Sequence, residues 1–505
     1  MIFNSFQFII FFITIIFLYY ILPHKTRWIL LLLASLVFYA AWNPLFLILL
    51  VFSVSVDYFL AIGIYDSYDK KRRKLFLTLD LFVAFSVLFI FKYLVFFSNA
   101  AVNLLNGLGL NLSPPGFSII LPLGISFYTF QAAGYLIDVY KGRQEPERNY
   151  FKFMLFITFF PQLVAGPIER ASSLLPQLFS RKKFKIDNII EGYKFMCFGF
   201  FKKVVIADRI GVAVNTVYGA PLNFDGLALI LATFLFAFQI YCDFSGYSDI
   251  AVGCSKMLGI DLTQNFRQPY LSRGTKAFWR RWHISLSAWF KDYLYFPLGG
   301  NRVGRLRHTF NTMVTFLVSG LWHGANWTFI IWGGLHGLYQ VIGNLIPAPK
   351  KKQRVSVWNG EKYQLTGEPL LHSRKPKELL IARFAQAVFT FSLVCFAWIF
   401  FRANSITDAF YIAANLLTGR ENWGDTLYVF TVLNSMGVTL FELLIGFGCI
   451  LFLFLSELFC GESCIHETLM NKPADARFVY YLLVTILVLS LGVFYSAAEF
   501  IYFQF

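Results

Sequence analysis

One histidine, His323, lies inside an apolar stretch, where a titratable side chain is costly unless something compensates it. It belongs to the segment Gly320-Leu321-Trp322-His323-Gly324-Ala325-Asn326-Trp327. An imidazole titrates near working pH, so His323 could take a proton from a hydroxyl group. The glycines would let a substrate or another backbone approach closely, and a neutral histidine that joins two helices fits the same pattern. At 1.5 Å per residue, His323 would lie about 23 Å along a helix rising from His308.

A second histidine, His283, lies in a segment where tryptophans and arginines alternate, from Phe278 to Asp292. Such a mixture is typical of a helix anchored at a membrane surface, and a direct chemical role for His283 is the other interpretation. Arginine has a planar, charged group that suits phosphate. We therefore expect a phosphorylated donor to be held by the basic residues of this region: Arg273, Lys276, Arg280 and Arg281.

Two carboxylates, Asp243 and Asp249, interrupt the apolar segment 238–249. Their separation of six residues turns them about 240° apart around a helix, so they do not form an acid–base pair on one face. Pairing with buried arginines is one task for them, and Asp243 is also a candidate for substrate binding.

Another apolar segment, 159–170, is interrupted by two prolines, Pro161 and Pro167. They predict a broken helix that either lines a cavity or is a structural kink.

Several catalytic motifs are absent from the sequence. It contains no Gly-x-Ser-x-Gly elbow, no phosphate-binding loop ending in Gly-Lys-Ser/Thr, no dinucleotide fingerprint and no His-Glu-x-x-His. A serine hydrolase, a P-loop ATPase and a typical zinc protease are therefore disfavoured. The seven cysteines are scattered, and Cys460, Cys464 and His466 have no usual zinc spacing, so we expect no metal site.

The elements that must position these residues are membrane helices. Of the 505 residues, 57% are hydrophobic and 14% are charged, whereas soluble proteins are about 25% charged. The segment 278–300 is aromatic but interrupted by charges, which indicates an interfacial or re-entrant helix. Apolar runs long enough to cross a bilayer predict membrane helices over 3–22, 28–42, 45–65, 74–98, 117–140, 150–168, 188–218, 225–253, 309–325, 327–346, 380–401, 428–457 and 478–498.

The charges indicate how these helices are oriented. Lysines and arginines occur at 24–27, 70–74 and 141–148, whereas the connections 43–44 and 99–116 carry no charge. Basic loops stay in the cytosol, so we expect the N-terminus outside, with 3–22 kept as a membrane helix rather than removed as a signal. The net charge of +16 lies in these loops, and we expect no nucleic-acid binding.

One long polar segment, 347–378, interrupts the apolar pattern. It carries eight lysines and arginines and is expected to be a cytosolic loop with little structure of its own. No repeat of fixed period occurs, so nothing indicates a transporter built from two similar halves.

Several of these segments together resemble the membrane-bound O-acyltransferase family, and within it the bacterial branch of alginate O-acetyltransferase-like proteins. The resemblance covers most of the chain between residues 1 and 405, in the family's order, and the region 406–505 looks generic. The matching segments are 121–131, 160–170, 239–249, 265–270, 278–289, 321–327 and 398–403.

The resemblance implies an all-α, polytopic fold of about 11–13 membrane helices with a central funnel or tunnel. It implies a single domain over residues 1–505, with the core motifs in 117–405. His323 matches the family's catalytic histidine and His283 its second characteristic polar position. Trp322 and Asn326 are expected to contact the substrate or donor, and Asn326 is a candidate to polarise the thioester. His336 gains no such support and is expected to be structural.

The implied activity is that of an O-acetyltransferase (EC 2.3.1.-) in the bacterial inner membrane. Its donor would be cytosolic acetyl-coenzyme A, with no permanently bound cofactor. The acceptor would be an extracytoplasmic polysaccharide such as alginate, reached directly or through a secreted partner protein. Acetylation of peptidoglycan or transfer of D-alanine to teichoic acid is an alternative. A transporter that moves a lipid-linked glycan without making bonds is the alternative from another class.

Overall fold

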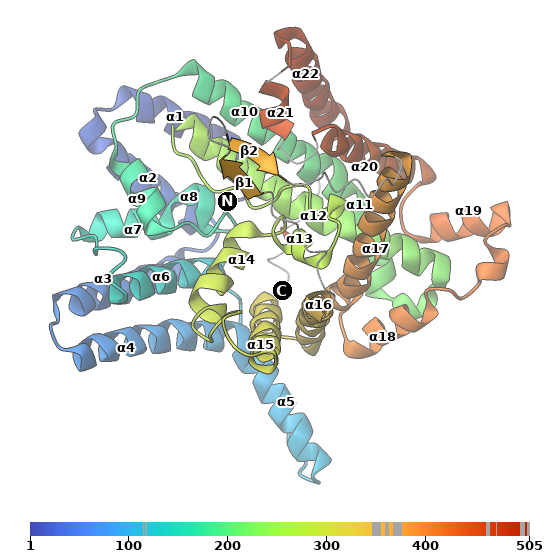
Figure 1. Ribbon diagram of the computed structural model, residues 1–505, viewed down its shortest axis with the longest axis horizontal. Coiled ribbons are helices and arrows are strands. Elements are labelled where there is room, and N and C mark those ends of the chain that lie inside the picture. The colour runs from blue at the N-terminus through green and yellow to red at the C-terminus, as the bar shows by residue number, and fades with distance from the viewer. Residues whose placement is uncertain are drawn as a thin grey trace.

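The protein is a bundle of helices around one long, mostly buried helix (Figure 1). The computed structural model describes residues 1–114, 116, 119–345, 355–358, 363–366, 376–460, 465–470, 472–494 and 500–501. The central helix is α12 (Gly226–Met257), which packs against α10 (Ile186–Phe200), α11 (Asp208–Gly219) and α17 (Pro376–Arg402). Burial of most of α12 follows from its composition, because apolar residues lie around its whole circumference and only a few charged ones interrupt them. The all-α membrane fold predicted from the sequence is confirmed.

The N-terminal part of the chain forms a group of helices on one side of α12 (Figure 1). In this group α3, α4 and α6 pack against one another, and α2 packs against α7. A π-helical turn, η1, joins α4 and α5 into one continuous rod, Lys70–Gly107. The bounds are α1 (Phe6–Ile21), α2 (His24–Ala40), α3 (Pro44–Asp66), α4 (Lys70–Leu88), η1 (Phe89–Tyr93), α5 (Leu94–Gly107), α6 (Ile125–Tyr140), α7 (Tyr150–Thr158), α8 (Phe160–Leu163) and α9 (Ala171–Phe179).

The middle of the chain contains the elements that carry the predicted site. A π-helical segment, η2, links α10 and α11. The segment 278–300 forms short helices rather than one membrane crossing, as the sequence predicted. Helices α15 and α16 pack as an antiparallel pair. The bounds are η2 (Phe201–Ala207), η3 (Pro221–Asn223), η4 (Pro269–Leu271), α13 (Thr275–Trp279), α14 (Ile284–Phe290), η5 (Lys291–Tyr295), α15 (Arg305–His323) and α16 (Trp327–Leu345).

The C-terminal part, generic in sequence, contributes to the core. Phe500 is buried against Phe244 and Tyr247 of α12, and the backbone N–H of Ile501 donates to Asp243. The predicted helix 428–457 is wrong in detail, because the chain turns at Gly437, where φ is +76°, and forms two helices. The bounds are α18 (Ile406–Asn415), η6 (Arg420–Asn422), α19 (Thr426–Ser435), α20 (Leu440–Cys460), α21 (Ile465–Met470) and α22 (Ala474–Leu491).

Six of the described helices are long and apolar enough to cross a membrane, fewer than the 11–13 predicted. Helices α1 and α2 have 16 and 17 residues, which is shorter than the roughly 20 that span a bilayer upright. The predicted helix 150–168 is broken at Phe159. The spans are Pro44–Asp66, Lys70–Gly107, Gly226–Met257, Ile381–Arg402, Leu440–Cys460 and Ala474–Leu491.

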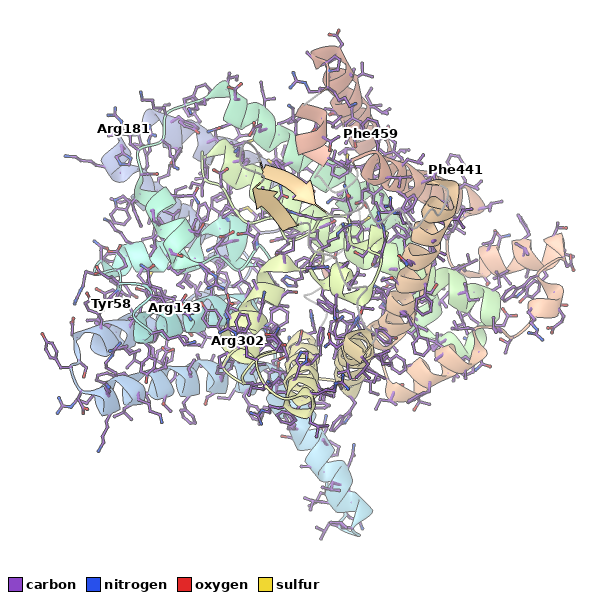
Figure 2. The ribbon with its side chains drawn as sticks, in the orientation of Figure 1. Tyr58, Arg143, Arg181, Arg302, Phe441 and Phe459 are labelled. Atoms are coloured by element: carbon purple, nitrogen blue, oxygen red, sulfur yellow. The ribbon has the colours of Figure 1, made fainter. Side chains whose placement is uncertain are left out.

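The polar loop 347–378 contains a short antiparallel hairpin, which the sequence did not predict. Its strands are β1 (Val355–Trp358) and β2 (Tyr363–Thr366). Most of the loop's basic residues lie outside the described part of the chain. Other loops carry arginines such as Arg143, Arg181 and Arg302, and Arg181 lies apart from the other two in the view of Figure 2. Basic charge is thus distributed over several connections rather than along one helix.

Candidate active site

His323 is the last residue of α15, at the tight turn into α16. The glycines of this motif allow the two helices to touch: a Cβ on Gly320 would lie 2.3 Å from the backbone oxygen of Phe329. A Cβ on Gly333 would lie 2.3 Å from the backbone oxygen of Phe316. The expected close approach of another backbone is therefore confirmed, and it positions the histidine at the end of a rigid pair of helices.

The His323 side chain is 3% exposed and is surrounded mainly by aromatic rings. Its ring centroid lies 4.9 Å from that of Trp322, 4.9 Å from that of Trp332 and 5.3 Å from that of Phe401. These rings come from α15, α16 and α17, so three helices must pack correctly to hold the imidazole in place.

A cavity of about 240 Å³ connects His323 with the protein surface. Its inner wall contains Trp322, His323 and Phe127, and its outer part contains Ile120, which is 65% exposed. Ile120 belongs to the segment that leads into α6 and follows the uncharged connection 99–116. His323 thus borders a cavity whose wall also contains an exposed residue, rather than being enclosed by side chains alone.

Lys92 also lines this cavity, and the sequence analysis did not single it out. Its ammonium group donates to the backbone oxygens of Trp322 and His323, at 2.8 and 2.9 Å. The hydroxyl of the next residue, Tyr93, donates to the backbone oxygen of Leu321 at 2.8 Å. A signal was available in the sequence, since Lys92 is a titratable residue within the predicted span 74–98.

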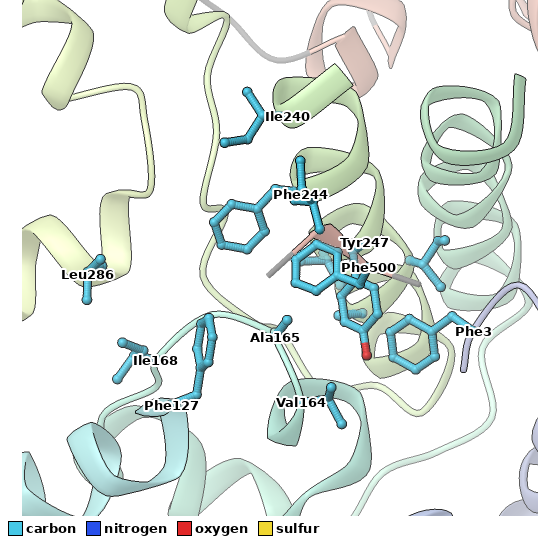
Figure 3. Close-up of a cluster of buried hydrophobic side chains, with 14 of the residues drawn as sticks. Phe3, Phe127, Val164, Ala165, Ile168, Ile240, Phe244, Tyr247, Leu286 and Phe500 are labelled. Atoms are coloured by element: carbon cyan, nitrogen blue, oxygen red, sulfur yellow. The ribbon is translucent and has the colours of Figure 1, made fainter. Parts of the chain in front are cut away.

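His283 is fully buried and lies against the same tryptophan as His323. Its ring centroid is 6.1 Å from that of Trp322, 4.7 Å from that of Phe244 and 6.2 Å from that of Phe127. Figure 3 shows how Phe127 and Phe244 approach this region from different helices. Neither ring nitrogen of His283 has a hydrogen-bond partner among the described residues.

The backbone of His283 is left-handed, with φ at +45°. Non-glycine residues adopt this conformation rarely, and such strain concentrates at functional sites. The residues that follow are held by Asn265, whose backbone oxygen accepts from the N–H of Ile284 and whose side chain accepts from Ser285. Interfacial anchoring does not describe such a buried ring, and the direct chemical role of His283 stays a prediction.

Two larger cavities lie on the side where α15 begins. One, of about 570 Å³, extends along α15 from His308 to Ser319, one helical turn before His323, and is also lined by Lys276 and Arg280. The other, of about 950 Å³, has Arg273, Arg280, Arg281 and Arg383 on an otherwise largely apolar wall. The predicted basic group is therefore brought together around cavities, with Arg383 of α17 as a member that sequence reasoning missed.

Asp243 and Asn326 have structural partners. Asp243 forms a salt bridge with Lys203 at 2.7 Å, and Lys203 also contacts Asp208. Asp249 pairs with Lys202 at 2.6 Å, so the expectation of arginine partners is wrong and lysines from η2 take that place. The side chain of Asn326 accepts from the N–H of Thr328 at the start of α16 and donates to the backbone oxygen of Asn404. Neither side chain lines the His323 cavity.

The broken helix predicted at Pro161 and Pro167 is present and borders the site. Helix α8 ends at Leu163, and Val164 lines the His323 cavity. Gly124, with φ at +71°, lies so close that a Cβ would be 2.5 Å from the backbone oxygen of Leu163. The break therefore lines a cavity, which is the functional interpretation of the prolines.

His336 lies apart from the His323 cavity, in a cluster of aromatic side chains. It is fully buried, and its Nδ1 accepts a hydrogen bond from the indole N–H of Trp279 at 3.3 Å. Phe278, Trp332 and Trp398 also contact the ring. These contacts agree with a structural role.

Comparison with known proteins identifies relatives over most of the chain. The probable alginate O-acetylase AlgI of Pseudomonas putida is 36% identical over 430 residues, which are 84% of this chain and 81% of that protein. The peptidoglycan O-acetyltransferase of Helicobacter pylori is 36% identical, over 77% of this chain and 73% of that protein. The teichoic acid D-alanyltransferase of Streptococcus thermophilus is 32% identical over 247 residues, which are 46% of this chain and 59% of that protein.

The profile of the membrane-bound O-acyltransferase family matches residues 36–354. This range contains both candidate histidines, the broken helix and the close α15–α16 pair described above. With its apolar helices and its acyltransferase relatives, the chain is a multi-pass membrane acyltransferase and belongs to the membrane-bound O-acyltransferase family.

Proposed function

We propose that the protein transfers an acetyl group from cytosolic acetyl-coenzyme A to a hydroxyl group outside the cell, as an enzyme of the bacterial inner membrane. The observation that carries this proposal is the arrangement of cavities along α15. One cavity leads from basic residues at its start to Ser319, and another leads from the exposed Ile120 to His323 at its end. A donor and an acceptor that approach from opposite ends of one helix would meet at the histidine.

The basic cavities suit the donor. Coenzyme A carries phosphates at one end and a thin thioester arm at the other. Arg280 lines both basic cavities, Arg281 lines the larger one, and guanidinium groups bind phosphate strongly. The arm would follow α15 past Ser319, while the phosphates stay with the arginines.

His323 would act as the general base. It takes the proton of the acceptor hydroxyl while the oxygen attacks the thioester carbonyl carbon. Collapse of the tetrahedral intermediate breaks the carbon–sulfur bond, and the proton passes from the imidazole to the departing thiolate. His283, whose ring lies against Trp322 of the cavity wall, would orient the thioester or polarise its carbonyl. Charges balance without any further reactant.

The acceptor we propose is an extracytoplasmic polysaccharide of the alginate type, acetylated directly or through a secreted partner protein. Support comes from the names of two relatives, an alginate O-acetylase and a peptidoglycan O-acetyltransferase, which are each 36% identical to this chain. Peptidoglycan is therefore the second candidate. Transfer of D-alanine to teichoic acid has weaker support, because that relative matches 46% of this chain.

The test compares wild-type protein with His323→Ala in proteoliposomes supplied with radiolabelled acetyl-coenzyme A. We expect the variant to fold, with a lower melting temperature because a buried ring is removed, and to lose release of coenzyme A and labelling of the acceptor by at least 100-fold, the scale of general-base catalysis. Leu306→Ala, on the same helix at a position that is 88% exposed and lines none of the cavities described above, is the matched control. A glycan transporter that makes no bonds would tolerate His323→Ala, and unchanged coenzyme A release in the folded variant would refute the proposal.

A further inference from the structure

We propose that Lys92 is a positioning residue for His323, an inference that rests on the proposed reaction. Lys92 lies on η1, in a different part of the chain from α15, and its ammonium bridges the last two backbone oxygens of α15. One of these oxygens belongs to His323 itself. The lysine therefore fixes the backbone of His323, which lines the cavity.

The charge of Lys92 suits the end of a helix. The last carbonyl groups of a helix have no partner within it, and its dipole makes this end negative. Lysine side chains near a C-terminus satisfy both requirements. The ammonium also lies 5.9 Å from the centre of the Trp322 ring, which adds a cation–π contact. Trp322 in turn contacts both candidate histidines.

No carboxylate forms a salt bridge with Lys92 within the described part of the chain. A lysine in an apolar span is costly without compensation. The two carbonyl oxygens and the indole ring are the compensation that the structure provides. All three of these contacts are made to Trp322 and His323, the catalytic candidate and its neighbour. This concentration of contacts at the site indicates that Lys92 supports His323 rather than the rod as a whole.

The π-helical turn explains how Lys92 reaches this place. Helices α4 and α5 would otherwise form a regular rod, and η1 widens it over Phe89–Tyr93. The turn directs two consecutive residues to three consecutive carbonyl oxygens, because Tyr93 bonds Leu321 while Lys92 bonds Trp322 and His323. Such π-helical turns occur frequently at functional sites.

Positioning of this kind affects the rate of the chemical step more than binding of the donor. A displacement of about 1 Å at a reacting group can lower a rate about 100-fold. The donor cavity at Arg280 lies at the other end of α15 and does not include Lys92. Removal of the ammonium should therefore lower kcat and leave the KM for acetyl-coenzyme A unchanged.

The experiment uses Lys92→Ala in proteoliposomes, assayed for acetyl transfer with and without propylammonium. The cavity is open to the surface at Ile120, so a cation of the size of the missing side chain can enter. We expect kcat to fall about 100-fold, with KM for acetyl-coenzyme A unchanged. Addition of propylammonium should then raise the kcat of the variant at least ten-fold. Propanol, which has a similar length and no charge, should restore nothing. Lys71→Ala, at an exposed position of the same rod, is the matched control and should behave as wild type in every condition.

A second pair of variants keeps the test informative if Lys92→Ala is unstable. Lys92→Arg retains the cation and should keep most of kcat, whereas Lys92→Gln can donate to a carbonyl without charge and should lose it. A folded Lys92→Gln with wild-type kcat, or a loss in Lys92→Ala that propylammonium does not restore, would overturn the inference. An inactive wild-type protein, or an active His323→Ala, would instead refute the proposed function.

Discussion

The contact between α15 and α16 leads to a prediction that tests how the site is held. Gly320→Ala adds one methyl group at a point where its carbon would lie 2.3 Å from the backbone oxygen of Phe329. An ordinary contact needs about 3.4 Å, so the two backbones must separate by about 1.1 Å. Backbone atoms cannot rotate away as a side chain can. We expect a loss of about 1–3 kcal/mol in stability and, because His323 lies three residues further on, a fall in kcat of about 100-fold.

The assay measures acetyl transfer and thermal unfolding of the same detergent-purified sample. Gly343→Ala is the control, because this glycine lies on α16 with nothing within 4 Å of the added carbon. It should retain wild-type activity and gain up to about 1 kcal/mol from the higher helix propensity of alanine. If Gly320→Ala unfolds and turns over like wild type, the close approach of the two helices does not position the histidine and the reasoning is wrong.

Three further changes separate donor binding from structural support. Asp243→Asn should lower stability by about 1–3 kcal/mol, the cost of losing a partner of a buried polar group, because Lys203 keeps its contact with Asp208; a changed KM for acetyl-coenzyme A at unchanged stability would instead make Asp243 a donor contact. His336→Leu should lower the melting temperature by removing the acceptor of the Trp279 N–H, and a folded variant without activity would contradict its structural role. Arg280→Gln should raise KM for acetyl-coenzyme A about ten-fold, since charge-assisted hydrogen bonds contribute about 1.5–3 kcal/mol, with kcat unchanged; equal KM values in titrations of both proteins would remove Arg280 from the donor site.

The sequence by itself determined the class of fold and the position of the main candidate residue. Length and continuity of apolar runs are local properties, so they predicted the principal helices, the break near Pro161 and the interrupted segment 278–300. The glycines around His323 likewise predicted that another backbone approaches this turn closely, because the absence of a side chain is a local property that the sequence shows directly.

Tertiary structure decided how that residue is held and reached. Lys92 and His323 are 231 positions apart, and no periodic pattern links them. The packing of the elements also decided that 428–457 divides into two helices. It likewise decided that lysines, rather than arginines, pair with Asp243 and Asp249. Hydrophobic periodicity specifies which face of a helix is buried, but it does not specify which helix will cover that face. The neighbour is decided only when all the helices pack. Both the carbonyl partners of Lys92 and the cavities along α15 arise at that stage.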